Sequence, residues 1–220
     1  MSTPIGNLGD MTFRAAEILS RVDLVACEDT RRTGLLFKHF DIRNRLLSYH
    51  DHNKLRRTPE ILEMLKQGKR VALVTDAGTP GVSDPGFYLI RAAIERGQRV
   101  VPVPGASAIL SALVVSGLPS DRFTFEGFLP RRQGRRHKRL VSLKDEMRTM
   151  VFYESARRVS KSLSEMLELL GDRNVVVGRE LTKRHEEVIR GRLSEVFAEL
   201  AKRSLKGETV VVVAGNERRD

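Results

Sequence analysis

The chain of 220 residues contains no tryptophan and a single cysteine, and aromatic residues make up 5% of it. One cysteine, Cys27, excludes an internal disulfide and fits a reducing compartment, so we expect a cytoplasmic protein. The scarcity of aromatic rings argues against a platform on which single-stranded bases stack. The apolar runs, such as VVVVA at 210–214, are far shorter than the roughly 20 residues that span a bilayer. We therefore expect no membrane partner, and the first ten residues show no signal peptide.

Several motifs that would indicate a particular chemistry are also missing. There is no GxxxxGK[ST] for nucleoside triphosphates and no GxGxxG for dinucleotides. No cysteine pair or HExxH accompanies the five histidines, so we expect no metal site. No GxSxG supports a serine nucleophile.

Positive charge is what the sequence has in excess, with a formal net charge of +11. Such a balance favours a polyanionic partner, most commonly nucleic acid. The run RRQGRRHKR (131–139) is a candidate phosphate clamp, and its alternative interpretation is a solvated helix start. The candidate RNA contacts are Arg131, Arg132, Arg135, Arg136, Lys138 and Arg139, together with Arg31 and Arg32 just past an expected strand.

Apolar runs alternate with helical patterns along the chain. We expect strands within the apolar runs 22–32, 71–81 and 99–108, which lead into loops, and helices at 13–22, 58–68, 86–97 and 106–117. Strand 149–155, helix 156–171, strand 174–181, helix 194–205 and strand 208–215 follow. This alternation predicts an α/β protein with a mostly parallel sheet. A proline-containing break near 117–119 divides it into domains 1–117 and 118–220.

Three loops lie where parallel strands would end, which is where such sheets bind ligands. The loop at 75–86 contains three glycines and two prolines (Pro80 and Pro85), a composition that allows close backbone approach in a stiff conformation. Segments 2–10 and 101–108 are also rich in small residues. The alternative for 75–86 is a stiff connection with no ligand.

Eight motifs occur together and in order: TPIGNLGDMTFRA, EDTRRT, SYHDHN, VTDAGTPGVSDPG, PVPGASA, FEGFLP, FYES and RELTKRHEEVIRG. In this the chain resembles the small-subunit rRNA methyltransferase I family, part of the tetrapyrrole methylase-like (class III) S-adenosylmethionine (SAM) methyltransferases. The resemblance implies two α/β domains with a SAM cleft between them, a homodimer, and 2′-O-methylation of a cytidine ribose in the decoding region of small-subunit (16S) rRNA. The family carries an apolar strand before TPIGN where this chain has Met1–Ser2, so we expect a truncated start.

The resemblance also implies which residues contact SAM. They are Pro4, Ile5, Gly6, Asp76, Gly78, Thr79, Ala106 and Ser107 in the first domain, and Tyr153, Leu181 and Ala214 in the second.

The motif RELTKRHEE supplies the candidate catalytic residues. Glu180 could accept the proton of the hydroxyl, and Lys183 could stabilise the alkoxide or act as a base if desolvation lowers its pKa. Glu126 and Glu154 are further candidates, and an ordinary ion pair with a basic residue is the alternative for each. Two other functions stay open, methylation of a tetrapyrrole and a non-catalytic basic module that binds the ribosome.

Overall fold

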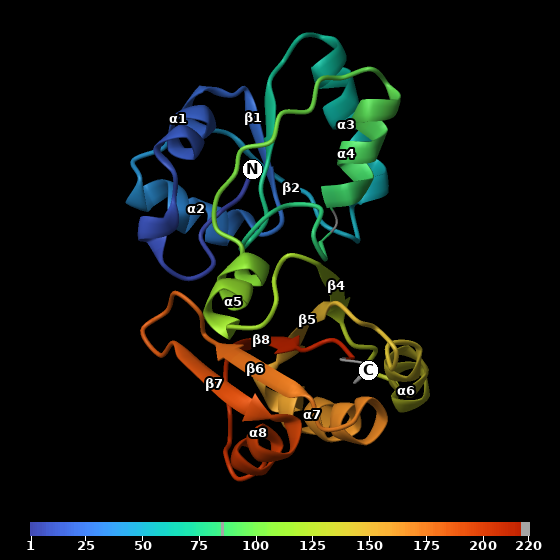
Figure 1. Cartoon of the computed structure of the whole chain (residues 1–220). Helices are drawn as coiled ribbons and strands as arrows, with labels where there is room; N and C mark the ends of the chain where they lie inside the picture. Colours follow the sequence, from blue (N-terminus) through green and yellow to red (C-terminus); the bar gives the residue numbers. More distant parts are fainter. Residues whose placement is uncertain (85, 217–220) are drawn as a thin grey trace. The chain divides into compact units, whose positions relative to one another are not determined.

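The computed structural model describes residues 1–84 and 86–216. The chain divides into two compact units, Met1–Ser107 and Ala108–Asp220, and each contains one β-sheet with helices packed on it (Figure 1). The expected α/β class is confirmed.

The first unit is built on a short parallel sheet in the order β2-β1-β3. Its elements are η1 (Leu8–Asp10), α1 (Phe13–Arg21), β1 (Leu24–Cys27), α2 (Thr30–His39), β2 (Leu46–Ser48), α3 (Lys54–Lys66), β3 (Val71–Leu73) and α4 (Gly86–Glu95). All four residues of β1 are buried, because helices cover both faces of the sheet. Val25 and Cys27 pack in one core with Leu19 and Phe37, and Ala26 packs in another with Ile61.

Two expectations for the first unit are wrong. Residues 99–106 form no strand, because Pro102 and Pro104 have no N–H to donate to a ladder. Helix α3 begins at Lys54 rather than at the expected residue 58, and the Thr58 hydroxyl bonds the buried Tyr49 hydroxyl at 3.0 Å. The expected stop at Gly68, with φ of +79°, is confirmed.

The second unit has a five-stranded sheet in the order β4-β5-β8-β6-β7. Its elements are α5 (Ala108–Ser116), β4 (Phe123–Phe128), α6 (Gln133–Ser142), β5 (Thr149–Ser155), α7 (Ala156–Leu170), β6 (Asn174–Arg179), β7 (Glu187–Arg192), α8 (Leu193–Leu200) and β8 (Glu208–Val213). Residues on β5 alternate between two cores: Phe152 packs with α7 and α8, and Val151 packs with α5.

Three features of the second unit differ from expectation. Only β4 and β5 pair in parallel, and the other ladders are antiparallel, so the mostly parallel prediction fails here. The units divide after Ser107 rather than after Gly117, because Ala112 and Leu113 of α5 pack on the second sheet. Strands β4 and β7 have too few buried residues to stand out in the sequence.

Candidate functional site

The three loops of the first unit that the sequence selected lie side by side. Thr3 and Gly78 exchange two backbone hydrogen bonds, of 2.9 and 3.1 Å. The Ser2 amide donates to the Val103 carbonyl at 3.1 Å, and the Ser2 and Thr79 hydroxyls are 2.8 Å apart. Segments far apart in the sequence therefore form one cluster beyond the carboxyl end of β3, hereafter the loop cluster (2–6, 75–84 and 102–107).

The loop after β3 is held in shape by its own hydrogen bonds. The Asp84 carboxylate accepts from the amides of Gly81 and Gly86, both at 2.7 Å. Gly78 and Gly81 have φ of +82° and +88°, a region that favours glycine. A Cβ on Gly86 would lie 2.9 Å from the Gly81 nitrogen, so the backbone approaches itself closely there. Pro85, which the sequence places in this loop, lies outside the described residues.

Asp76, at the start of this loop, fastens it to the end of β1. Its carboxylate accepts from the Asp29 amide at 3.0 Å and lies 3.4 Å from the Arg32 guanidinium. Arg31 donates twice to Asp29, at 3.1 and 2.7 Å, and these bonds hold the pKa of Asp29 well below its usual range. Arg31 and Arg32, both predicted to bind RNA, therefore have carboxylate partners, although each side chain is largely exposed.

The other expected cofactor residues of the first unit belong to the same cluster. Pro4 and Ile5 are buried, and Gly6 is exposed. Ile5 lies behind Gly78, since a Cβ on that glycine would meet it at 3.6 Å. Ala106 and Ser107 are half-buried and end the unit.

In the second unit, Tyr153 and Leu181 share one core with α5. The Tyr153 ring packs edge-on against Phe125, with centroids 4.9 Å apart, and tilted against Phe128 at 5.4 Å. Leu181 is buried and packs over Gly178, where a Cβ would come within 3.1 Å of it. These two predicted cofactor contacts lie in one part of this unit.

Ala214, the third predicted cofactor contact of this unit, lies elsewhere, and the structure does not bring it together with Tyr153 and Leu181. Strand β8 runs antiparallel to β6, so Val210 pairs with Gly178 whereas the Ala214 amide donates to the Asn174 carbonyl at 2.9 Å. Four residues of strand separate these points by about 13 Å. The part of β8 near Leu181 is its beginning, Glu208–Thr209.

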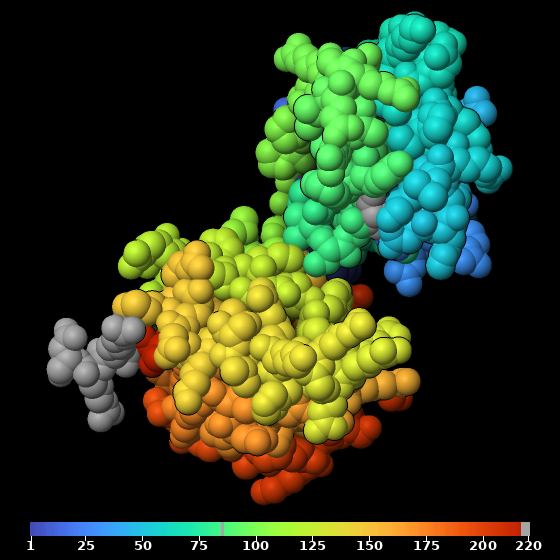
Figure 2. All heavy atoms as spheres, turned by 90° about the vertical axis from the view of Figure 1, so that its right-hand side faces the viewer, coloured from blue at the N-terminus to red at the C-terminus, as the bar shows by residue number. Residues whose placement is uncertain are grey.

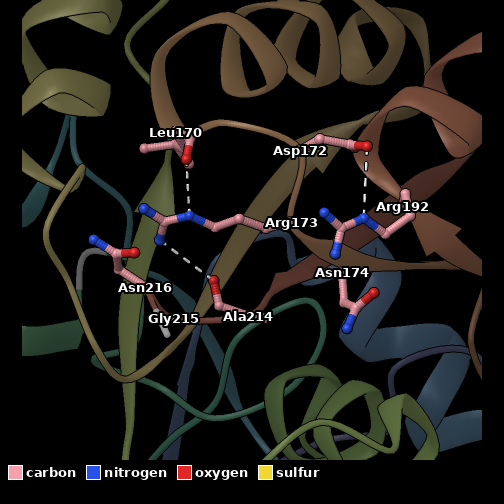
Figure 3. A pocket seen from close by; sticks show the side chains of 8 residues that line it. All are labelled: Leu170, Asp172, Arg173, Asn174, Arg192, Ala214, Gly215 and Asn216. Atoms are coloured by element: carbon pink, nitrogen blue, oxygen red, sulfur yellow. Dashed lines mark hydrogen bonds and ion pairs between the residues drawn. The ribbon is translucent and has the colours of Figure 1, made fainter. Parts of the chain in front are cut away.

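Ala214 instead lines a small pocket at the far end of that sheet (Figure 3). The pocket is lined by Leu170, Asp172, Arg173, Asn174, Arg192, Ala214, Gly215 and Asn216. Buried Arg173 donates to the carbonyls of Leu170 at 2.9 Å and Ala214 at 3.5 Å, so it ties α7 to the end of β8.

Glu180 and Lys183, the predicted catalytic pair, form an ion pair. The Glu180 Oε1 accepts from the Lys183 ammonium and from the Glu208 amide, both at 2.9 Å, and Lys183 also donates to the Glu208 carboxylate at 2.9 Å. Burial opposes the charge on Lys183, but these hydrogen bonds outweigh it and raise the pKa of the amine. The condition for Lys183 as a base, a lowered pKa, is therefore not met. Burial raises the pKa of the Glu180 carboxyl, but the hydrogen bonds from Lys183 and the Glu208 amide outweigh burial, so the pKa is lowered.

The two alternative carboxylates are also occupied. Glu126 pairs with Arg139. Glu154 is buried, accepts from the Ser162 hydroxyl at 2.7 Å and lies 3.4 Å from Arg158.

The basic run forms α6, and one of its arginines is structural. The Arg136 side chain is 3% exposed and donates to both oxygens of Glu165, at 2.6 and 2.5 Å. It also donates to the carbonyls of Pro130 and Arg131, at 3.2 and 3.0 Å. The prediction that Arg136 contacts RNA is therefore wrong, because this buried guanidinium already donates four hydrogen bonds within the protein.

The other basic residues of this run lie at the surface. Figure 2 shows the yellow segment that contains α6 on the visible face of the second unit. The exposed side chains are Arg131, Arg132, Arg135, Lys138 and Arg139. Except for Arg139, none of these has an ion-pair partner among the described residues. Arg158 donates to the Leu129 carbonyl at 3.0 Å, which brings the beginning of α7, with exposed Arg157, beside this run.

The described part of the chain shows no metal-ligand cluster of three or more His, Cys, Asp or Glu side chains. None of its helices has the length and apolar character needed to cross a membrane.

With this geometry in view, comparison with known proteins is decisive. Residues 2–197 match the family described as Tetrapyrrole (Corrin/Porphyrin) Methylases. The chain is 50% identical over 216 residues to the ribosomal RNA small subunit methyltransferase I of Synechocystis sp., covering 98% of this chain and 77% of that protein. It is 48% identical over 217 residues to the protein of the same name from Thermotoga maritima, covering 99% and 97%. The chain belongs to the ribosomal RNA small subunit methyltransferase I family.

Solved structures extend the likeness to the fold. Diphthine synthase aligns with a TM-score of 0.69 at 17% identity, covering 96% of this chain and 87% of that one. The methyltransferase CobJ aligns at 0.68 and 20% identity, covering 100% and 96%. At such identities the match shows the fold, which is that of the tetrapyrrole methylases.

Two polar residues near the loop cluster were not among the candidates that the sequence suggested. Glu28 and His50 follow β1 and β2, at the same carboxyl edge of the sheet as the loop cluster. Both lie within motifs that carried the resemblance, EDTRRT and SYHDHN. Glu28 directly follows β1, and His50 lies two residues after the end of β2. That position was the available signal.

Proposed function

We propose that this protein transfers a methyl group from SAM to the ribose 2′-oxygen of a cytidine in the decoding region of small-subunit rRNA. The observation that carries the proposal is the loop cluster. A member of the ribosomal RNA small subunit methyltransferase I family has three small-residue loops assembled at the carboxyl edge of a parallel sheet.

The loop cluster is suited to a compact polar cofactor. Gly78 and neighbouring backbone leave little side-chain bulk, and the Asp76 carboxylate can accept hydrogen bonds from hydroxyl or amino groups. The Asp76 and Asp84 carboxylates of the loop cluster favour a cationic sulfonium. We assign SAM contacts to Pro4, Ile5, Gly6, Asp76, Gly78, Thr79, Ala106 and Ser107, and in the second unit to the surface near Tyr153 and Leu181.

The chemistry requires mainly positioning. SAM already carries a good leaving group, so holding the 2′-oxygen in line with the S–CH₃ bond supplies up to about 7–11 kcal/mol of the barrier. Glu180 and Lys183, charged and paired, are assigned to orienting the substrate at the loop after β6. The positive charge of Lys183 suits a nearby phosphate or developing alkoxide.

We assign RNA contacts to the exposed arginines and lysine of the basic run 131–139 and to Arg157 beside them. Arg31 and Arg32 are assigned the same role. Exposed cations at a surface bind phosphates by releasing counterions, which makes affinity fall steeply with salt.

We also propose that the protein acts as a homodimer in the cytoplasm, where ribosomal subunits are found. Helices α3 and α4 expose Leu55, Phe87 and Ile94, each more than half exposed, and a second copy could bury them. Sedimentation equilibrium showing only monomers at micromolar concentration would contradict the dimer.

The experiment that tests the function uses small subunits from cells that lack the modification. They are incubated with the protein and SAM bearing a deuterated methyl group, and the RNA is digested to nucleosides for mass spectrometry. We expect deuterated 2′-O-methylcytidine, and none with subunits that already carry the methyl group. Label on a base would refute the ribose assignment. SAM binding without any RNA label, but with a shifted Soret band on adding a porphyrin, would favour the tetrapyrrole alternative.

A further inference from the structure

Glu28 occupies a fixed position at the carboxyl edge of the first sheet. It directly follows β1, the central strand. The residue before it, Cys27, accepts from the Tyr49 amide at 2.7 Å, and the residue after it, Asp29, donates to Asp76 at 3.0 Å. Glu28 is thus held between the end of β2 and the loop cluster.

The Glu28 side chain is half-buried, yet its carboxylate makes no hydrogen bond or ion pair within the described ranges. The other candidate bases, Glu126, Glu154 and Glu180, are all paired with cations. An uncommitted carboxylate in a chain with 39 lysines and arginines is available for another partner.

The charges that act on Glu28 come from three neighbouring segments. Asp51 lies in the turn after β2, Asp76 and Asp84 lie in the loop after β3, and Arg32 lies in α2. Burial and the three carboxylates raise the pKa of Glu28 above its usual value, and Arg32 opposes them only partly. A carboxylate with increased proton affinity is a better general base.

A separate observation, an unpartnered ring nitrogen of His50, points to a polar ligand at this edge. The Asn53 amide is oriented by its bonds to the Ser48 carbonyl and the His50 amide, so its N–H donates to His50 Nε2 at 3.2 Å. The ring proton of His50 then resides on Nδ1, which is buried and has no acceptor among the described residues. Such an N–H calls for an acceptor oxygen that the described residues do not supply.

We propose that Glu28 is the catalytic base of the methyl transfer, an inference that rests on the proposed function. The 2′-oxygen attacks the methyl carbon of SAM, the S–CH₃ bond breaks with its electron pair going to sulfur, and the O–CH₃ bond forms. The hydroxyl proton passes to the Glu28 carboxylate and then to water. The products are S-adenosylhomocysteine, the methyl ether and one proton.

The test compares single-turnover methyl transfer by wild type, Glu28→Gln, Glu28→Asp and the control Glu168→Gln, which changes an exposed glutamate of α7. We expect Glu28→Gln to slow transfer by about 100- to 10,000-fold, because general-base help is lost. SAM affinity, measured by calorimetry, should be unchanged. Glu28→Asp keeps a carboxylate and should recover part of the rate, and Glu168→Gln should match wild type.

The pH profile provides a readout that a merely structural role would not change. The wild-type rate should rise with pH as Glu28 loses its proton and then level off, and this rise should be absent in Glu28→Gln. A Glu28→Gln rate within about threefold of wild type, or a profile that keeps the same rise, would overturn the assignment. Wild type that transfers no methyl group to RNA would instead overturn the proposed function, and the base assignment with it.

Discussion

Two neighbouring arginines of α6 should behave differently when each is replaced by alanine. Arg136 is buried in its bidentate pair with Glu165, whereas Arg135 is exposed and has no ion-pair partner in the described part of the chain. We expect Arg136→Ala to destabilise the fold and Arg135→Ala to weaken RNA binding.

The expected magnitudes follow from burial. The Arg136 side chain is 3% exposed and that of Glu165 is 14% exposed, so Arg136→Ala leaves a largely buried carboxylate without its cation. Breaking a buried pair in this way costs about 3–5 kcal/mol. The carbonyls of Pro130 and Arg131 also lose a donor. Arg135→Ala should change the free energy of unfolding by no more than about 0.5 kcal/mol.

The assay is urea unfolding followed by far-ultraviolet circular dichroism, combined with the salt dependence of RNA binding. Arg135→Ala should make the plot of the logarithm of the RNA binding constant against the logarithm of salt concentration less steep, by the amount expected for about one lost phosphate contact. Folded Arg136→Ala should leave that slope unchanged. Arg136 bonds also hold the pKa of Glu165 below its usual value. The stability from this pair is therefore present above the unfolded-state pKa, about 4.3, and is lost as pH falls through the lower folded-state value. Equal unfolding midpoints for the two variants at neutral pH would refute this reasoning.

Two further predictions concern other parts of the molecule. The hydrogen bonds of Arg148 lower the pKa of Glu146 to about 2, so an NMR titration of Arg148→Ala should return it toward about 4.3; an unchanged value would exclude Arg148 as the cause. Gly78→Ala would place a side chain at φ of +82°, costing about 1–2 kcal/mol. If that strain is relieved by moving the loop, calorimetry should show SAM affinity reduced by about 5- to 30-fold, and an unaltered affinity would remove Gly78 from the site.

The sequence predicted the elements with strong, uninterrupted patterns. Strand 149–155 was predicted with the bounds that the structure gives, because its first five residues are apolar or β-compatible and an amphipathic helical pattern follows. The predicted helix 13–22 begins where α1 begins and ends one residue beyond it, and Thr12 caps the amino end of α1. Both patterns are local, so neighbours in the chain determine them.

The misses come from interactions across the chain. Strand β2 has three half-buried residues and depends on pairing with β1 for its existence. The reversal of strand direction in the second sheet is set by which strands pair, and no residue pattern encodes it locally.

The site shows the same division. Composition selected the loops, and the structure brings Thr3, Gly78 and Val103 together by hydrogen bonds that the sequence alone does not specify. Arg136 and Arg135 are equivalent as letters in a basic run, and only the packing of α6 on α7 separates their roles. The separation of Ala214 from Leu181 could not be foreseen, because it depends on the antiparallel pairing of β8 with β6.

Hydrogen exchange of backbone amides with and without SAM tests most directly the claim that the loop cluster binds the methyl donor. The claim predicts that SAM slows exchange in segments 2–6, 75–84 and 102–107, with the strongest protection at Gly78 and Thr79. Protection confined to other segments, or no change at saturating SAM, would contradict it.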